Sequence, residues 1–187
     1  MTDIENLVVQ MINDDKDAFN DLMTLYYGKS IRLAFLISGK YADSEDIVQE
    51  AFTSCYINRK KIKEPQYFER WLYKIISRKA WAYSKKAKRE QPVEEVFEEN
   101  APDSFSLADS VIDSIENKEI FNAVMSLPIK QRTVVVLYYY NSLTTKEIAQ
   151  ITGSFEGTVK SRLHNARKAI KKIIESSENS YKQEVPI

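Results

Sequence analysis

Apolar side chains recur along this chain at the spacing of helices rather than strands. Residues 4–12 and residues 19–26 both follow the i, i+3, i+4 interval of an amphipathic helix. A third pattern, residues 47–56, follows Asp43 and Ser44, either of which would be a good N-cap. No stretch alternates with a period of two between turn signals, so we expect an all-α fold without a sheet.

Two further stretches, residues 68–76 and residues 134–136, each allow more than one interpretation. In residues 68–76, the spacing favours a core role for the apolar side chains, namely Phe68, Trp71, Leu72, Ile75 and Ile76. The β-branched run at residues 134–136 would suit a strand in isolation. However, Pro128 suits the first turn of a helix, and the apolar positions that follow keep helical spacing. We therefore predict a helix that ends near Asn141.

The region from Thr144 onward has the pattern of two short helices joined by a tight turn. Thr144 and Glu147 form a capping box, in which each side chain satisfies a free backbone amide at the start of a helix. That helix should stop at Gly153, and Ser154 can cap the next one. This arrangement predicts a helix-turn-helix.

The last helix divides into two faces when its residues are placed at 100° intervals. The predicted buried face contains Val159, Leu163, Ala166 and Ile170. The opposite face contains Gly157, Lys160, Ser161, His164, Asn165, Lys168 and Lys171. A glycine in a helix costs about 1 kcal/mol relative to alanine, but it suits a surface that must approach a phosphate backbone closely. The short hydrogen-bonding side chains suit base edges, and the lysines suit phosphates.

The chain has 27 basic and 27 acidic residues, but they are unevenly distributed. Basic clusters occupy residues 59–63, 78–89 and 160–172, whereas residues 90–119 hold ten acidic residues and one basic one. The acidic segment also contains two prolines, which indicates a flexible linker. Any one basic cluster could be only a solvated face. Clusters on two modules favour a polyanion that is bound at two places.

Aromatic and basic residues alternate between residues 59 and 89. Unpaired nucleic-acid strands need this combination, because basic groups bind the phosphates and exposed rings stack on bases taken out of the duplex. For Phe68 and Trp71, however, helical spacing favours a place in the core of a helical bundle.

Several classes of function lack the residues they need. Cys55 and His164 are the only cysteine and histidine, so a disulfide, a zinc cluster and a Ser/His/Asp triad are not expected. The glycines form no nucleotide-binding loop. We expect no enzyme activity, catalytic residue, cofactor or metal. The apolar run at residues 134–140 is too short to cross a bilayer, and the first residues carry acids, so we expect a cytoplasmic protein without membrane insertion.

The chain resembles the extracytoplasmic-function (group IV) sigma factors of the bacterial sigma-70 family. The resemblance covers about residues 5–172 and rests on residues 43–52, residues 68–75, the Leu127-Pro128 pair, residues 157–163 and Ala166-Arg167. It implies two small helical domains. Residues 1–89 would be the region 2 bundle, residues 90–117 the acidic linker, residues 118–175 the region 4 helix-turn-helix and residues 176–187 a tail.

The resemblance also implies three sites. The −35 promoter element would be read by Gly157, Thr158, Lys160, Ser161, Arg162, His164, Asn165 and Lys168. The −10 element would be recognised and opened by Lys60, Lys61, Lys63, Arg78, Ala82, Lys85 and Lys86. Core RNA polymerase would dock on Asp43, Glu45, Asp46, Gln49 and Glu50.

The implied partners are promoter DNA, the β′ clamp helices and β flap of core RNA polymerase, and an anti-sigma factor. The anti-sigma factor could hold the protein at the membrane until a stress is sensed. The alternative is a stand-alone helix-turn-helix repressor, which would bind duplex DNA tightly without polymerase. That alternative leaves the acidic face at residues 43–50 and the aromatic-basic stretch without a role.

Overall fold

The structure, a computed structural model, describes residues 2–90 and 115–183 and contains helices without strands in these ranges. It divides into two compact units. Most of the predicted linker, residues 91–114, lies outside the described residues. The last four residues of the predicted tail, residues 184–187, also lie outside them.

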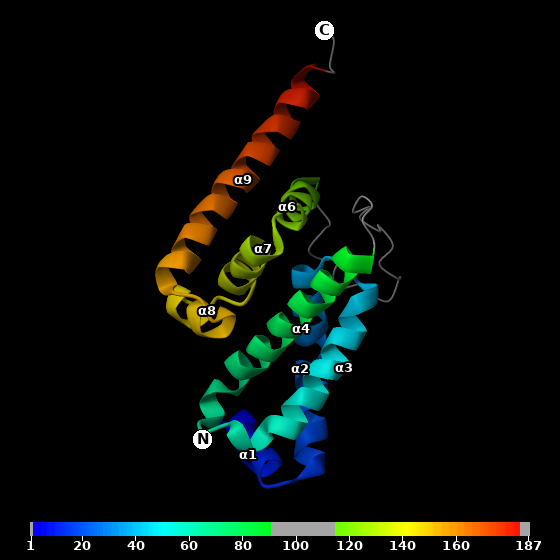
Figure 1. Ribbon diagram of the computed structural model, residues 1–187, viewed down its shortest axis with the longest axis vertical. Helices are drawn as coiled ribbons and strands as arrows, with labels where there is room; N and C mark the ends of the chain where they lie inside the picture. Colours follow the sequence, from blue (N-terminus) through cyan, green and yellow to red (C-terminus); the bar gives the residue numbers. More distant parts are fainter. Residues whose placement is uncertain (1, 91–114, 184–187) are drawn as a thin grey trace. The chain divides into compact units, whose positions relative to one another are not determined.

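The first unit is a helical bundle (Figure 1). Its helices are α1 (Asp3–Ile12), α2 (Lys16–Ser38), α3 (Ala42–Asn58) and α4 (Phe68–Glu90), with the single turns η1 (Arg59–Lys61) and η2 (Pro65–Tyr67) between α3 and α4. Helices α2, α3 and α4 pack on one another, and α1 packs against α2. The core formed between them includes Leu22, Leu33, Ile47, Phe68 and Leu72, all at most 1% exposed.

Local sequence explains most of the boundaries in this bundle. Thr2 and Glu5 form a capping box at the start of α1, and the Asp15 side chain caps α2. Helix α2 ends at Gly39, whose φ of 81° is the left-handed conformation that glycine adopts without strain.

The predicted start of α3 was wrong. The helix begins at Ala42, and neither Asp43 nor Ser44 is its N-cap. Ser44 is instead buried, and its hydroxyl donates to the Lys40 carbonyl at 3.0 Å. Ser44 therefore lies inside the first turns of the helix, where a serine hydroxyl commonly bonds to the carbonyl four residues earlier instead of capping.

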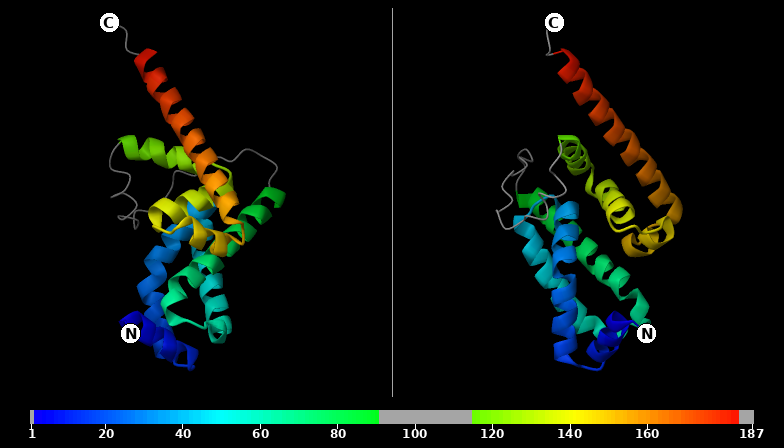
Figure 2. Two further views of the ribbon diagram at one scale, coloured as in Figure 1. Left: turned by 90° about the vertical axis from the view of Figure 1, so that its left-hand side faces the viewer. Right: turned by 180° about the vertical axis from the view of Figure 1, so that it is seen from behind.

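The second unit is built around α6 (Ile115–Met125), α7 (Ile129–Val135) and α9 (Glu156–Gln183). Both α6 and α7 pack against α9, as Figure 2 shows from two sides. Arg132 of α7 is buried, and its guanidinium donates to the Met125 carbonyl at 2.7 Å, which satisfies the end of α6.

The stretch after α7 confirms the choice of helix over strand for residues 134–136. Helix α7 continues as a π-helical turn, η3 (Val136–Tyr140), in which the Asn141 amide donates to the Val136 carbonyl at 3.2 Å. The helix therefore ends at Asn141, as predicted. Helix α8 (Thr145–Thr152) follows and leads into α9.

Candidate nucleic-acid interfaces

Helices α8 and α9 form the predicted helix-turn-helix. The Thr144 amide donates to Glu147 Oε2 at 2.7 Å and the Glu147 amide donates to Thr144 Oγ1 at 3.3 Å, so the capping box is confirmed. Between the helices, Gly153 has a φ of 64°. The Ser154 amide donates back to the Ala149 carbonyl at 3.0 Å.

Ser154 does not cap α9 as predicted. It lies two residues before the helix, and its hydroxyl accepts a hydrogen bond from Arg162 Nη1 at 3.0 Å. The contact holds the half-buried Arg162 guanidinium against the turn. Among the predicted −35 residues, Arg162 therefore supports the start of α9.

The two faces of α9 agree with the angular prediction. Val159, Leu163 and Ala166 are at most 4% exposed, and Ile170 is half-buried. The predicted DNA face is exposed at Gly157, Lys160, Ser161, His164, Asn165 and Lys168, while Thr158 is half-buried. A Cβ added at Gly157 would meet no atom within 4 Å, so the fold itself does not require glycine there.

Lys160 is engaged at the first turn of α9. Its ammonium lies 2.9 Å from Glu156 Oε1, and the same oxygen accepts from the Thr145 hydroxyl at 2.8 Å. These hydrogen bonds, Lys160 first, hold the pKa of Glu156 below its usual value. Glu156 therefore links α8 to α9, and it sits beside a lysine predicted to contact DNA.

In the first unit, the turn η1 is held by an acid that lies 45 residues earlier in the chain. Asp14 follows α1 with a φ of 73°, and its carboxylate pairs with Arg59 and Lys60; the Arg59 Nε donates to Asp14 Oδ1 at 2.9 Å. Hydrogen bonds from Lys60 and then from Arg59 lower the pKa of Asp14. The Arg59 guanidinium also lies over the Tyr56 ring at 4.1 Å. Lys60, a predicted −10 residue, is thus oriented by α1.

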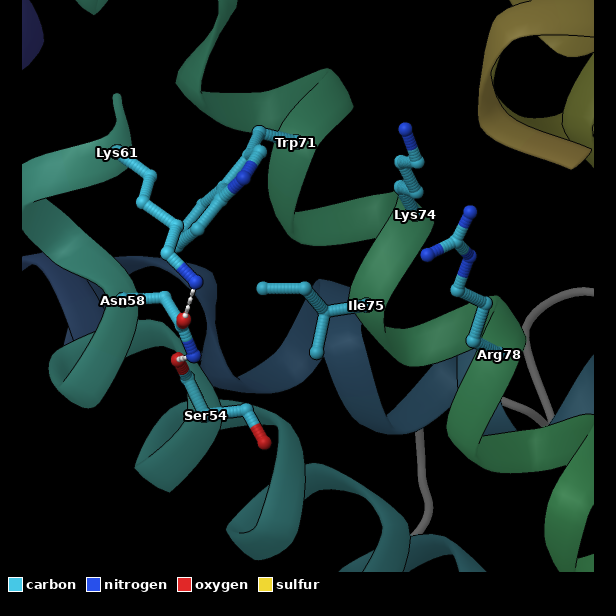
Figure 3. A pocket seen from close by; sticks show the side chains of 7 residues that line it. All are labelled: Ser54, Asn58, Lys61, Trp71, Lys74, Ile75 and Arg78. Atoms are coloured by element: carbon cyan, nitrogen blue, oxygen red, sulfur yellow. Dashed lines mark hydrogen bonds between the residues drawn. The ribbon is translucent and has the colours of Figure 1, made fainter. Parts of the chain in front are cut away.

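A hollow of about 210 Å³ lies where α3 meets α4 (Figure 3). It brings together Lys61 and Arg78, which were predicted for the −10 site, with two residues that were not, Trp71 and Lys74. The Lys61 ammonium donates to Asn58 Oδ1 at 2.7 Å. The hollow thus combines three cationic side chains with one indole ring.

Trp71 was predicted to be a core residue, but it is only partly buried. Phe68, Leu72 and Ile76 are buried as predicted, whereas Trp71 and Ile75 are half-buried and line the hollow. The signal for this was present in the sequence, because residues 71, 74, 75, 78, 82 and 85 recur at helical spacing. They form one stripe along α4 that ends in the exposed Ala82 and Lys85. Lys63 and Lys86 are also exposed, Lys63 between η1 and η2.

The acidic face of α3 carries the predicted docking residues. Glu45, Asp46, Gln49 and Glu50 are exposed, and Asp43 is half-exposed. Glu50 differs from the others because both of its oxygens are bonded to α4. Lys79 Nζ lies 2.6 Å from Oε2, and the Tyr83 hydroxyl donates to Oε1 at 2.8 Å.

These contacts shift two pKa values in opposite directions. Hydrogen bonds from Lys79 and then Tyr83 lower the pKa of Glu50. The hydrogen bond to Glu50, with burial and the nearby carboxylates Asp46 and Asp43, raises the pKa of Tyr83 to about 12. Tyr83 therefore remains a neutral donor throughout the physiological range.

Neither a metal centre nor a membrane span emerges from the ranges 2–90 and 115–183. Within them, no three histidine, cysteine, aspartate or glutamate side chains are grouped to hold a metal ion. None of the helices there has the length and apolar character that crossing a bilayer requires. Cys55 is buried, and burial raises the pKa of its thiol to about 12, so it is an inert core residue.

Both units of the chain are similar to known proteins. Family models for Sigma-70 region 2 and Sigma-70, region 4 match residues 22–90 and 117–170. Two solved structures share the fold. One is the sigma factor RpoE with the anti-sigma factor NepR from Bartonella quintana, with a TM-score of 0.67, 23% identity and coverage of 86% of this chain and 98% of that one. The other is CnrH in complex with the cytosolic domain of CnrY, with a TM-score of 0.65, 19% identity and coverage of 92% and 97%.

Sequence relatives extend the match to nearly the whole chain. The extracytoplasmic-function RNA polymerase sigma factor SigW of Bacillus subtilis is 33% identical, over 90% of this chain and 95% of that protein. The sigma-E factor of Escherichia coli K12 is also 33% identical, over 88% and 90%. With identity at this level over both units and both region models matched, the chain belongs to the extracytoplasmic-function RNA polymerase sigma factors of the sigma-70 family.

Proposed function

We propose that this sigma factor brings core RNA polymerase to its promoters by holding the −35 duplex with α9 and the opened −10 strand with α4 and η1. It performs no chemistry of its own. The observation that carries the proposal is the division of α9, in which one face packs into the second unit and the other exposes short polar side chains between lysines.

The −35 surface suits the major groove in three respects. The N-terminal part of the second helix of a helix-turn-helix enters that groove, and here it carries a glycine that lets the backbone approach. Ser161, His164 and Asn165 have short polar side chains that reach base edges, while lysines contact phosphates. The proposed set is Gly157, Thr158, Lys160, Ser161, Arg162, His164, Asn165 and Lys168.

The −10 surface suits an unpaired strand instead of a duplex. The hollow between α3 and α4 offers an indole ring beside three cations, which combines stacking with phosphate attraction. The proposed set is Lys60, Lys61, Lys63, Arg78, Ala82, Lys85 and Lys86, to which the hollow adds Trp71 and Lys74.

The acidic face of α3 is the proposed docking surface for polymerase. Asp43, Glu45, Asp46, Gln49 and Glu50 follow one side of a rigid helix, and such a stripe attracts a basic partner surface. By analogy with the family, the partner would be core RNA polymerase, through its β′ clamp helices and β flap. The proposed domains are residues 1–89, 90–117, 118–175 and 176–187, as region 2, linker, region 4 and tail.

Regulation by an anti-sigma factor is proposed from the same relationship. One of the solved structures with this fold contains a sigma factor bound to the anti-sigma factor NepR. By analogy, a group IV factor of this kind would reside in the cytoplasm, would be masked by an anti-sigma factor that could be tethered to the membrane, and would be released under stress.

Reconstituted transcription tests this proposal. Purified core polymerase should produce run-off transcripts from selected genomic promoters only when this protein is added, and sequencing those transcripts would reveal the shared −35 and −10 elements. A stand-alone repressor would instead bind duplex DNA tightly without polymerase and leave start-site selection unchanged. That result would overturn the proposal.

A further inference from the structure

Phe155 is the most exposed large hydrophobic side chain in the part of the chain that the structure describes. It is 86% exposed, and the next, Ile57, is 69% exposed. Phe155 lies in the turn of the helix-turn-helix, directly before α9 and two residues before Gly157. An exposed ring at this point needs an explanation that the fold does not provide.

Local stability does not favour phenylalanine at this position. The Phe155 carbonyl accepts hydrogen bonds from the amides of Thr158 at 2.9 Å and Val159 at 3.1 Å, so Phe155 occupies the N-cap of α9. An apolar side chain cannot accept a bond from the free amides of the first turn, and its presence there costs about 1 kcal/mol relative to serine or aspartate. Neither capping nor packing therefore accounts for the ring.

The two residues that flank Phe155 are both held in place by hydrogen bonds. Glu156, the first residue of α9, is bonded to Thr145 of α8 at 2.8 Å and to Lys160 at 2.9 Å. On the other side, the Ser154 hydroxyl accepts from Arg162 at 3.0 Å. Both neighbours of Phe155 are thus tied to the helices of the motif, which reduces the entropy lost when the ring meets a ligand.

The chemistry of the major groove supplies a matching group. Each thymine projects a C5-methyl there, and an apolar side chain such as phenylalanine recognises it by contact. Residues at the start of the second helix are the ones that reach base edges. The lysines and the amide, imidazole and hydroxyl groups proposed for α9 suit phosphates and hydrogen-bonding edges. Among those residues only Thr158 carries a methyl group, and it is half-buried, whereas Phe155 is 86% exposed.

We infer that Phe155 is a specificity-determining residue of this sigma factor, which reads the methyl group of one thymine in the −35 element. The inference rests on the proposed function, because it requires that α9 read a −35 element. It adds a direct apolar contact to the polar and ionic contacts proposed for the same helix.

Replacing thymine by uracil, one position at a time, tests the inference because the substitution removes only the methyl group. Promoters selected by the wild-type holoenzyme are prepared with each −35 thymine replaced on either strand. Binding is then compared for holoenzymes carrying the wild-type protein, Phe155→Ala, or the control Ile173→Ala, which truncates another exposed apolar side chain further along α9. At one position, uracil should weaken wild-type binding about fourfold, as expected for one methyl group.

The variants decide whether Phe155 is responsible for that effect. Phe155→Ala should bind the thymine promoter several-fold more weakly and should no longer distinguish thymine from uracil at that position, whereas Ile173→Ala should retain the wild-type response. The assignment is overturned if no position responds to uracil, if Phe155→Ala keeps the fourfold response, or if the selected −35 element contains no A·T pair. It is also overturned if Phe155→Ala weakens binding to core polymerase instead of promoter choice.

These outcomes differ from failure of the proposed function. If the wild-type holoenzyme started transcription without regard to any −35 sequence, the role of α9 itself would be wrong. If it depended on the −35 element but not on the methyl group, the role of α9 would stand and the assignment of Phe155 would fall.

Discussion

Glu50 of α3 and Lys79 of α4 form a short ion pair, with 2.6 Å between Oε2 and Nζ. The Tyr83 hydroxyl binds the other carboxylate oxygen at 2.8 Å. A residue on the proposed docking face thus also fixes α4, the helix that carries the proposed −10 stripe. The contact joins two surfaces of the first unit that are expected to bind different partners.

The Glu50 contacts should stabilise the first unit measurably. Lys79→Met removes a cation whose side chain is 33% exposed, and we expect the free energy of unfolding to fall by about 1 kcal/mol, the upper part of the range for such pairs. Lys29→Met is the matched control, because its pair with Glu69 is longer, at 3.5 Å, and more exposed. Urea unfolding should show little change for the control. Equal losses in the two variants would contradict the prediction.

The same carboxylate should give the stability a dependence on acid pH. Hydrogen bonds from Lys79 and Tyr83 hold the pKa of Glu50 in the folded protein below its value in the unfolded chain. Its contribution to stability is therefore present above the unfolded pKa and is lost as the pH falls through the folded pKa. Unfolding of the wild type and Glu50→Gln should therefore differ at pH 7 and converge as the pH falls below the pKa of folded Glu50. A difference that stayed constant over this range would show that Glu50 stabilises the fold by something other than its charge.

Charge reversal tests the docking face. Glu45→Lys with Asp46→Lys should weaken core polymerase binding at least tenfold, since opposed like charges cost several kcal/mol at an interface, while the helical content stays unchanged. Asp17→Lys with Asp21→Lys makes the same change in charge on α2 and serves as the control. Affinity can be measured by competition for fluorescent core enzyme. Unchanged affinity of the first variant would refute the docking assignment.

Gly157→Ala should separate stability from DNA binding. A Cβ there meets no atom within 4 Å, and alanine is the better helix former by up to about 1 kcal/mol, so the melting temperature should stay constant or rise. Promoter binding should nevertheless fall, because the added methyl group occupies the space needed by the DNA. Gly28→Ala in α2 is equally open and should raise stability without affecting promoters. Normal promoter binding by Gly157→Ala would contradict the proposal that this glycine lets the α9 backbone approach the DNA closely.

Lys160→Ala with His164→Ala should reduce −35 selectivity more than affinity for core polymerase. Each lost phosphate contact should also lower the slope of log affinity against log salt by about 1. Lys130→Ala, which removes an exposed lysine from α7, is the control. An equal loss of promoter selectivity and polymerase affinity would count against the division of α9 into two faces.

Features set by neighbours along the chain were predictable. The capping box of Thr144 and Glu147, the left-handed turn at Gly153 and the buried stripe of α9 all follow from rules that act over about four residues. These local rules predict the helix-turn-helix and its exposed face from the sequence alone. The predicted start of α3 was wrong because the Ser44 hydroxyl is buried and bonds to the Lys40 carbonyl instead of capping the helix.

Contacts between distant residues were not predictable in the same way. Asp14 and Arg59 are 45 positions apart, and nothing in the sequence indicates that the end of α1 orients η1. Helical spacing indicates that Trp71, Lys74 and Arg78 share one face of α4. Only the packing of α3 against α4, however, leaves Trp71 half-buried and brings Lys61 to the same hollow.

The sequence by itself determined the helices, the helix-turn-helix, the two-module layout and the family resemblance, because helical periodicity and capping are local properties. Tertiary structure alone decided which charges pair between helices, which rings remain exposed and where the hollow between α3 and α4 opens. Those properties depend on which side chains the packed helices bring together, and spacing along one helix carries no information about its neighbours.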